Sequence, residues 1–236
     1  MYTGDLDIVY FVKEAPRNEE LRYSLRSVAA NMPHKRVWIF GGCPTNIAPD
    51  IYVKVNQEGN TKWDKVRAMF KMAAENKELT DNFILFNDDF YIMEPTDHLF
   101  PAYRGTLQEY IKVIEDNYRH QPTSYTRLLR ECDKKLESLG KTKFAYELHA
   151  PFIFNKKKLL RVIEEFPDQH CTRTFYGNLY KIGGERRSDV KVFSDKPPFD
   201  FKATQFLSSD DTVVNVNNAV WRYLRKTFNK KSEFER

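Results

Sequence analysis

The chain has 236 residues, of which 41% are hydrophobic, 14% aromatic and 30% charged, so it can bury a real core in one domain or two small ones. Its formal net charge of +5 is compatible with an anionic substrate or with weak nucleic-acid contact, and it requires neither. The three cysteines, Cys43, Cys132 and Cys171, are far apart and form no CxxC pair, which argues against a disulfide framework or a zinc site and for a reducing compartment.

Short apolar runs alternate with helical patterns in the first part of the chain. Strands are expected at residues 7–12, 36–40, 51–55 and 83–86, and helices at residues 19–31 and 61–77. Asn18 is the expected N-cap of the first helix, whose apolar stripe is Leu21, Leu25 and Val28. This β-α-β-β-α-β order predicts an α/β fold with a mostly parallel central sheet flanked by helices.

The rest of the chain is less regular. Helices are expected at residues 106–118, 124–139, 156–165, 172–181 and 214–228, and an alternating strand at residues 143–149. No stretch has the composition of a linker, so we predict a single domain over residues 1–236 that ends in a frayed polar tail at residues 229–236. Because no apolar run has the length of a membrane span and no secretory leader is evident, we expect a soluble, cytoplasmic protein.

The strongest functional signal is the segment FILFNDDFY at residues 83–91. A short apolar run ends in Asn87, Asp88 and Asp89 and resumes at Phe90, which is typical of a strand buried on both faces. A buried carboxylate without a partner costs on the order of several kcal/mol, so both acids need partners. Ligands of open α/β sheets bind at the carboxyl ends of the strands, which predicts a divalent cation, Mn²⁺ or Mg²⁺, and the ligand that it carries. The alternative is an Asx turn whose carboxylates accept backbone N–H groups.

Two arginines, Arg22 and Arg26, lie four residues apart on one face of the first expected helix. The amino end of this helix follows the first strand, where backbone N–H groups would hold a phosphate. Guanidinium groups there would bind a diphosphate in bidentate fashion. The alternative is a solvated edge on which the arginines form ordinary ion pairs with Glu19 or Glu20.

Glu147 and His149 fall on one side of the strand expected at residues 143–149, and Phe144, Tyr146 and Leu148 fall on the other. A carboxylate and an imidazole side by side could be a base and its orienting partner, or a metal ligand and its partner. A surface pair on an edge strand is the alternative.

Two further patterns are weaker. Arg173 shares a helical face with Tyr176 and Gly177, and the glycine would let a ligand or a neighbouring helix approach closely. A packed aromatic stripe, with Arg173 reaching toward solvent, is the alternative. Asp210 and Asp211 repeat the pattern of a strand followed by two acids, although one of them could instead cap the terminal helix.

Several catalytic and nucleotide-binding motifs are absent from the sequence. It contains no GxGxxG, GxxxxGK[ST], GxSxG or HExxH pattern, so neither a dinucleotide fingerprint nor a P-loop is indicated.

Four segments resemble, in the same order, segments of the Stealth proteins, which are bacterial capsule sugar-phosphate transferases with the animal lysosomal-enzyme GlcNAc-1-phosphotransferase as a relative. Residues 18–27 (NEELRYSLRS) look very like the family's NELRYSLRS segment, and residues 83–89 (FILFNDD) resemble its FIYLNDD segment. Residues 149–151 (HAP) with 155–156 (NK) are similar to an H-x-P…(D/N)-K segment, and residues 207–211 to a late acid pair. The family's opening DGSD box is absent after the first strand.

The resemblance implies a glycosyltransferase-A-like nucleotide-sugar fold, a UDP-type donor and a divalent metal. It assigns the donor phosphates to Arg22 and Arg26. The metal and the sugar are assigned to Asp88 and Asp89, and the reacting end to His149 and Asp211.

We therefore predict three sets of site residues. The donor-binding set is Val12, Lys13, Arg22, Arg26, Asp88 and Arg173; the metal ligands are Asp89 and His149; and the catalytic set is Asp211 as the favoured base with His149 and Glu147.

The predicted function is metal-dependent glycosyl transfer from a UDP-sugar to a glycan, a glycolipid or a modified nucleic acid, as in polysaccharide or capsule synthesis. Transfer of sugar-1-phosphate is one alternative, and a non-catalytic nucleic-acid-binding module is another.

Overall fold

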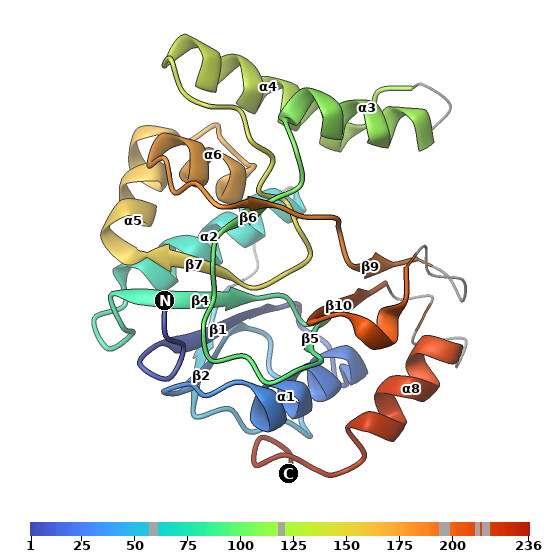
Figure 1. Cartoon of the computed structure of the whole chain (residues 1–236). Helices are drawn as coiled ribbons and strands as arrows, with labels where there is room; N and C mark the ends of the chain where they lie inside the picture. Colours follow the sequence, from blue (N-terminus) through green and yellow to red (C-terminus); the bar gives the residue numbers. More distant parts are fainter. Residues whose placement is uncertain (57–60, 118–120, 194–198, 211–212, 214–217) are drawn as a thin grey trace. The chain divides into compact units, whose positions relative to one another are not determined.

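The structure, a computed structural model, describes residues 1–56, 61–117, 121–193, 199–210, 213 and 218–236 (Figure 1). The chain folds into two compact units. The first unit consists of Met1–Leu99, His149–Asn155 and Val190–Arg236, and the second of Phe100–Leu148 and Lys156–Asp189. The sequence predicted a single domain because the chain passes between the units without any stretch of linker composition.

The first unit contains a five-stranded sheet in the order β3-β2-β1-β4-β7 (Figure 1). The strands are β1 (Asp7–Val12), β2 (Val37–Gly41), β3 (Ile51–Lys54), β4 (Asn82–Phe86) and β7 (Phe152–Asn155). The first four run parallel to one another, with Ile8 in register with Val37 and Ile84, and β7 is antiparallel to β4 at one edge. The expected mostly parallel sheet is confirmed, whereas β7 was not expected.

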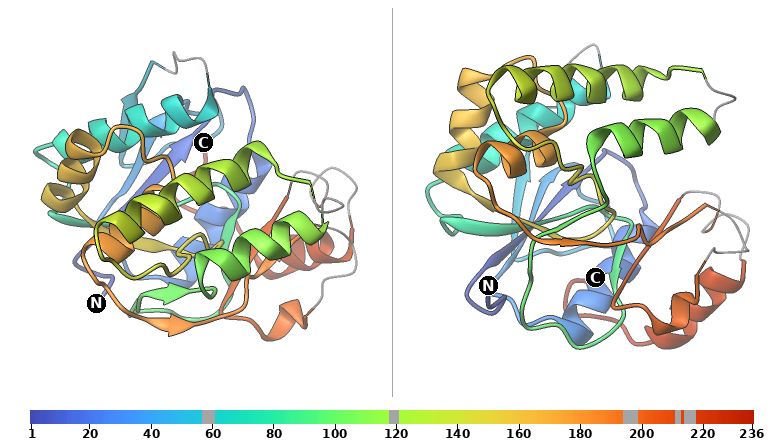
Figure 2. Two further views of the ribbon diagram at one scale, coloured as in Figure 1. Left: turned by 90° about the horizontal axis from the view of Figure 1, so that it is seen from above. Right: turned by 45° about the horizontal axis from the view of Figure 1, so that its top comes forward.

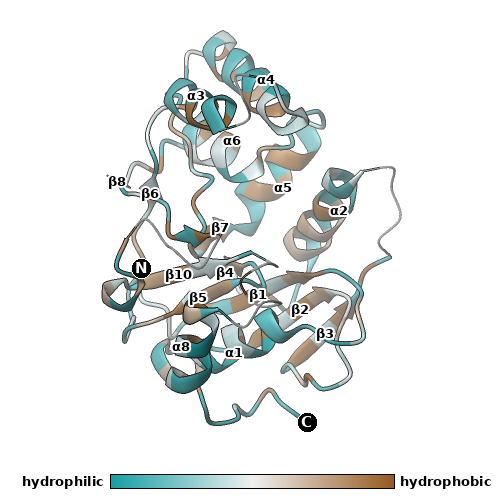
Figure 3. Cartoon of the chain, turned by 90° about the vertical axis from the view of Figure 1, so that its right-hand side faces the viewer, coloured by the Kyte–Doolittle hydropathy of each residue, from teal (hydrophilic) through white to brown (hydrophobic). Residues whose placement is uncertain are grey.

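Two helices cover opposite faces of this sheet, α1 (Glu19–Asn31) and α2 (Lys62–Glu75). Alternate residues of β1 explain this arrangement, because successive side chains of a strand point to opposite faces. Tyr10 belongs to a buried core with Leu21 and Leu25 of α1. The ring of the next residue, Phe11, lies 4.8 Å from that of Phe70 in α2. Figure 3 shows the strands between the helices as mostly hydrophobic.

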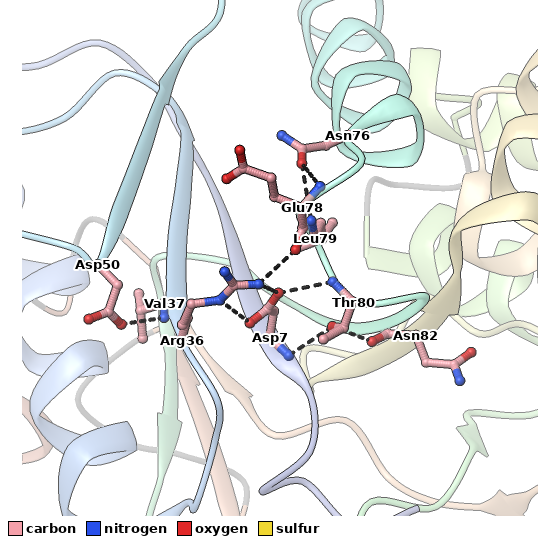
Figure 4. Close-up of polar contacts among 9 residues, drawn as sticks. All are labelled: Asp7, Arg36, Val37, Asp50, Asn76, Glu78, Leu79, Thr80 and Asn82. Atoms are coloured by element: carbon pink, nitrogen blue, oxygen red, sulfur yellow. Dashed lines mark hydrogen bonds and ion pairs between the residues drawn. The ribbon is translucent and has the colours of Figure 1, made fainter.

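A saturated polar network lies at the amino end of the sheet (Figure 4). Asp7 is fully buried, and its two carboxylate oxygens accept hydrogen bonds from Arg36 Nε at 3.0 Å and Arg36 Nη2 at 2.8 Å. Thr80 N also donates to Asp7 Oδ2 at 3.0 Å, and Asp7 N donates to Thr80 Oγ1 at the same distance. This network joins the start of β1 to β2 and to the loop that leads into β4.

A smaller three-stranded sheet follows the acid pair. It consists of β5 (Phe90–Ile92), β10 (Phe206–Ser209) and β9 (Lys191–Val192), with β10 antiparallel to β5 and parallel to β9. A 3₁₀ helix (Phe201–Ala203) precedes β10, and α8 (Ala219–Thr227) packs Trp221 and Leu224 into one core with Leu207. Residues 214–217 of the expected terminal helix lie outside the described residues.

The second unit contains four helices among its described residues, α3 (Leu107–Asn117), α4 (Ser124–Ser138), α5 (Lys156–Glu165) and α6 (Thr172–Leu179). Its short strands β6 (Ala102–Tyr103) and β8 (Glu185–Arg186) pair in parallel. Figure 2 shows α3 and α4 side by side. A Cβ on Gly177 would lie 2.5 Å from the ring of Tyr146, so this glycine allows α6 to pack closely against an aromatic side chain.

The strand predicted at residues 143–149 is wrong. The segment forms only an isolated bridge, between Thr106 and Phe144. Side chains of α6 take two of its backbone N–H groups: Asn178 Oδ1 accepts from Phe144 N at 2.8 Å, and Thr174 Oγ1 accepts from Tyr146 N at 3.0 Å. Ala145 bonds instead to the backbone of the segment before α3, where its N–H donates to the Gly105 carbonyl at 2.8 Å. The backbone is therefore satisfied partly by a helix's side chains and partly by a short backbone contact, and no regular strand forms.

The prediction that residues 229–236 form a frayed tail is also wrong. Phe234 is 3% exposed, and its carbonyl oxygen accepts from Ala48 N at 2.8 Å. The side chain of Glu235 is 2% exposed and pairs with Arg26 of α1. One apolar ring and one ion pair therefore hold a polar segment in place. Among the described helices, none has the length and apolar character needed to cross a membrane.

Candidate functional site

A pocket of about 480 Å³ lies in the first unit, where the chain leaves β4 and enters β5. The described residues that line it are Glu20, Asn87, Asp88, Asp89, Lys191, Ser209 and Asp210. Four carboxylates and one ammonium group give these residues a formal charge of −3. An anionic ligand would be repelled by this acid pocket unless a cation accompanied it.

Asp88 is tied to the amino end of α1. Asn18 caps the helix by accepting a hydrogen bond from Leu21 N at 2.9 Å through its Oδ1 atom. The amide nitrogen of the same side chain donates to Asp88 Oδ2 at 2.6 Å. The positive end of the helix dipole stabilises carboxylates placed in this way. The expected N-cap is confirmed, and the cap also positions the first acid of the pair.

Asp89 is 7% exposed and unevenly bonded. Its Oδ2 atom accepts from Lys191 Nζ at 2.7 Å and from Ser208 Oγ at 3.0 Å. Its Oδ1 atom is inaccessible to solvent and has no hydrogen-bond partner among the described residues. A buried polar atom left unsatisfied costs about 1–3 kcal/mol, and more when it is charged. Oδ1 is therefore the atom at which a cation would be most strongly favoured.

A buried chain of hydroxyl groups positions Glu20 at the pocket. The Tyr91 hydroxyl lies 2.9 Å from Ser209 Oγ, and Ser209 Oγ donates to Glu20 Oε1 at 3.0 Å. Burial first, and then the nearby Glu20 carboxylate, raise the pKa of Tyr91 well above its usual value. The tyrosine therefore stays protonated and donates to Ser209, which in turn donates to Glu20.

No three His, Cys, Asp or Glu side chains among the described residues are grouped so that they could hold a metal ion by themselves. Mg²⁺ is commonly bound by only one or two carboxylates together with substrate phosphates. The unsatisfied oxygen of Asp89, with Asp88 beside it in the pocket lining, fits a cation that arrives with a diphosphate.

Five predicted residues of the first unit are not among the described residues that line the acid pocket: His149, Val12, Lys13, Arg22 and Arg26. The His149 ring lies 6.3 Å from the ring of Phe90 in an edge-to-face arrangement. Phe90 is the residue that follows Asp89 in the sequence. Val12 ends β1, and its side chain is fully buried in the core, so only its backbone could contact a nucleotide. Lys13 follows it and is exposed. Their roles remain predictions.

Arg26, one of the two arginines predicted to bind the donor phosphates, is bonded to the C-terminal segment. Its Nε and Nη2 atoms donate to the two carboxylate oxygens of Glu235 at 2.6 and 2.8 Å, and Nη1 donates to the Phe228 carbonyl at 2.9 Å. The side chain is 7% exposed, so Arg26 holds the C-terminal segment. Arg22 forms the alternative ion pair with Glu19 and keeps 25% exposure. The donor-binding roles of both arginines remain predictions.

Glu147 and Arg173 belong to the second unit, where both hold the segment before β7 against α6. Glu147 Oε1 accepts from Thr174 N at 3.2 Å, and Arg173 Nη1 donates to the Leu148 carbonyl at 2.9 Å. Their catalytic and donor-binding roles remain predictions. Asp211, the favoured base, lies outside the described residues, although its neighbour Asp210 lines the acid pocket.

Sequence reasoning did not assign four residues that surround the acid pair: Glu20, Lys191, Ser208 and Ser209. Glu20 had a signal, because it lies in the first turn of a helix that follows a strand end, but the sequence indicated it only as a possible ion-pair partner of the two arginines. The two serines precede the second acid pair directly. Lys191 had no signal, because its two-residue strand is too short to produce a pattern.

No family model matches the sequence, and the comparison with curated proteins finds no match. Among solved structures, mouse xyloside xylosyltransferase 1 in its apo form aligns with 98% of this chain and 96% of its own, at 8% identity and a TM-score of 0.33. An alignment at that TM-score establishes no common fold. The resemblance to Stealth proteins rests on the quoted segments.

Proposed function

We propose that the protein is a metal-dependent glycosyltransferase that binds a nucleotide-activated sugar, with UDP as the expected nucleotide, in the acid pocket of the first unit. The observation that carries this proposal is the buried Asp89, whose Oδ1 atom has no hydrogen-bond partner among the described residues, in a pocket whose described lining has a formal charge of −3. Such a pocket favours a cation and, through the cation, a diphosphate. The resemblance of residues 18–27 and 83–89 to Stealth segments supports the class of donor.

The residues of the pocket would have different roles in binding the cation and the donor. Asp89 would hold the cation through Oδ1, with Asp88 beside it and oriented by Asn18. When bound, the cation would neutralise the charge that develops on the leaving diphosphate. The Tyr91 and Ser209 hydroxyls fix the Glu20 carboxylate, which could accept hydrogen bonds from sugar hydroxyls at the mouth of the pocket.

We place the catalytic base directly after the last residue of the described pocket lining. Asp211 is adjacent in sequence to Asp210, and we retain it as the base that takes the proton of the acceptor hydroxyl. The acceptor would be a glycan, a glycolipid or a modified nucleic acid.

Transfer of sugar-1-phosphate is the second candidate function, because it uses the same donor. The absence of a DGSD box after β1 favours glycosyl transfer over it. The two reactions differ in the nucleotide that they release, which is UDP for glycosyl transfer and UMP for sugar-phosphate transfer.

The test is to incubate the whole chain with a panel of UDP-sugars and Mn²⁺, with and without excess chelator, and to separate UDP from UMP by chromatography. Slow hydrolysis can be followed even without an acceptor. We expect release of UDP that stops in chelator. Full activity in chelator contradicts the metal role, and release of UMP selects the second function. Steeply salt-dependent DNA binding without any turnover would support a non-catalytic nucleic-acid-binding module instead.

A further inference from the structure

Lys191 carries the only positive charge among the described residues that line the acid pocket. It lies on β9, and the pairing of β9 with β10 and of β10 with β5 brings it to the start of β5. Its ammonium group is 2.7 Å from Asp89 Oδ2, and the two side chains are 16% and 10% exposed. The most buried acid of the lining therefore already has a cation from the chain itself.

Only one of the two carboxylate oxygens of Asp89 takes part in this ion pair. The ammonium and the Ser208 hydroxyl both bond to Oδ2 of Asp89, while Oδ1 of the same carboxylate has no partner among the described residues. A divalent cation at Oδ1 would lie only a few ångströms from the ammonium. Like charges at such a distance in a partly desolvated site repel each other strongly, so the two cations would not share the carboxylate without cost.

We propose that Lys191 is an internal counter-ion that competes with the divalent cation for Asp89 and moves onto the donor diphosphate when the cation binds. This inference rests on the proposed function, because it concerns the same donor site. Without a nucleotide, the displaced ammonium would lose its partner beside a new positive charge, so the metal alone should bind weakly. With a diphosphate present, the ammonium gains a charge-assisted partner, and metal and donor should bind together.

The experiment measures Mn²⁺ affinity, with and without UDP, from the electron paramagnetic resonance signal of free Mn²⁺. Lys191→Met removes the charge and keeps an unbranched side chain. We expect this variant to bind Mn²⁺ alone at least tenfold more tightly than the natural chain, and UDP to increase its affinity less. Lys191→Arg keeps a positive charge beside Asp89 and should bind Mn²⁺ no more tightly than the natural chain.

Lys112→Met is the matched control. Lys112 also lies 2.7 Å from a carboxylate, that of Asp116, but its side chain is 75% exposed and belongs to the second unit. The substitution makes the same change in net charge and removes a Lys–Asp pair of the same length. Its Mn²⁺ affinity should stay within twofold of that of the natural chain.

The proposal is overturned if Lys191→Met binds Mn²⁺ as weakly as the natural chain, or if none of the proteins binds Mn²⁺. Should Lys191→Met not fold in chelator, Lys191→Gln, which keeps a hydrogen-bond donor for Asp89, enters the same titration with the same two outcomes. Turnover of UDP-sugars with unchanged Mn²⁺ affinity in the variant removes only the role of Lys191. Tighter Mn²⁺ binding in the variant without any UDP-sugar turnover removes only the proposed reaction.

Discussion

Two buried aspartates lie at opposite ends of the parallel strands, and they are bonded differently. Asp7, at the amino end of β1, receives hydrogen bonds on both carboxylate oxygens from Arg36 and Thr80 (Figure 4). Asp89, just beyond the carboxyl end of β4, receives them from the described residues on Oδ2 only. A carboxylate whose partners are complete stabilises the fold, whereas one with an oxygen left over is suited to a ligand.

The chemistry of the partner cation explains the difference. The forked guanidinium of Arg36 bonds to both oxygens of Asp7 and closes that carboxylate. The ammonium of Lys191 is a compact charge that bonds to one oxygen of Asp89, and the other oxygen has no partner among the described residues. Pairing with an arginine therefore makes Asp7 a structural carboxylate, whereas pairing with a lysine leaves one oxygen of Asp89 available to a ligand.

The largest expected effect is on turnover. Asp89→Asn removes the charge that would hold the cation, and we expect UDP-sugar turnover to fall by at least about 100-fold, the scale of losing one electrostatic contact to a transition state. The melting temperature should change little, because the amide oxygen of the asparagine can still accept hydrogen bonds from Lys191 Nζ and Ser208 Oγ. Asp97→Asn, in an acid that is 69% exposed in the same unit, is the control. Normal turnover of Asp89→Asn would place the active site elsewhere.

The second effect is on stability, and it should distinguish the structural role of Asp7 from the ligand-binding role of Asp89. Asp7→Asn replaces a carboxylate that accepts two hydrogen bonds from a guanidinium group, and we expect the free energy of unfolding to fall by about 2–3 kcal/mol. The affinity for UDP should stay the same, because this network lies at the other end of the strands. Urea unfolding and calorimetric UDP titration of the same preparation measure both quantities. A loss of UDP binding at unchanged stability would reverse the assignment of the two ends.

The smallest expected effect is a pH dependence of the free energy of unfolding, caused by a third buried carboxylate, that of Glu235. Burial alone would raise the pKa of Glu235, but hydrogen bonds from Arg26 and from Ser232 N outweigh it and lower the pKa below its usual value. The contact therefore stabilises the fold above the unfolded-state pKa of about 4.3, and this stabilisation is lost as the pH falls through the lower folded-state value.

Unfolding in urea between pH 6 and pH 3 measures that effect. The natural chain should lose stability more steeply with acid than Glu235→Gln, which has no carboxylate to protonate. Equal slopes for the two proteins would show that Glu235 has the same pKa folded and unfolded. If Glu235 behaves as expected, it belongs with Asp7 among the carboxylates that serve the fold.

The local elements were predictable from the sequence. The buried strand over residues 83–86 and the Asn18 cap of α1 match the structure to within a residue, because apolar periodicity and capping chemistry act over a few neighbouring positions. The acid pair was recognisable for the same reason. Two carboxylates directly after a buried strand need partners wherever the rest of the chain lies.

Only the tertiary structure determined which partners those are. Lys191 lies 102 residues from Asp89 and Ser208 lies 119 residues from it, and no local pattern links such positions. The same holds for Arg26 and Glu235, 209 residues apart, whose ion pair turns a polar tail into a buried segment. Periodicity in a sequence records which face of an element is apolar. The pairing of distant charges depends on how strands and helices pack, and that pairing decides which acid is saturated and which remains open to a ligand.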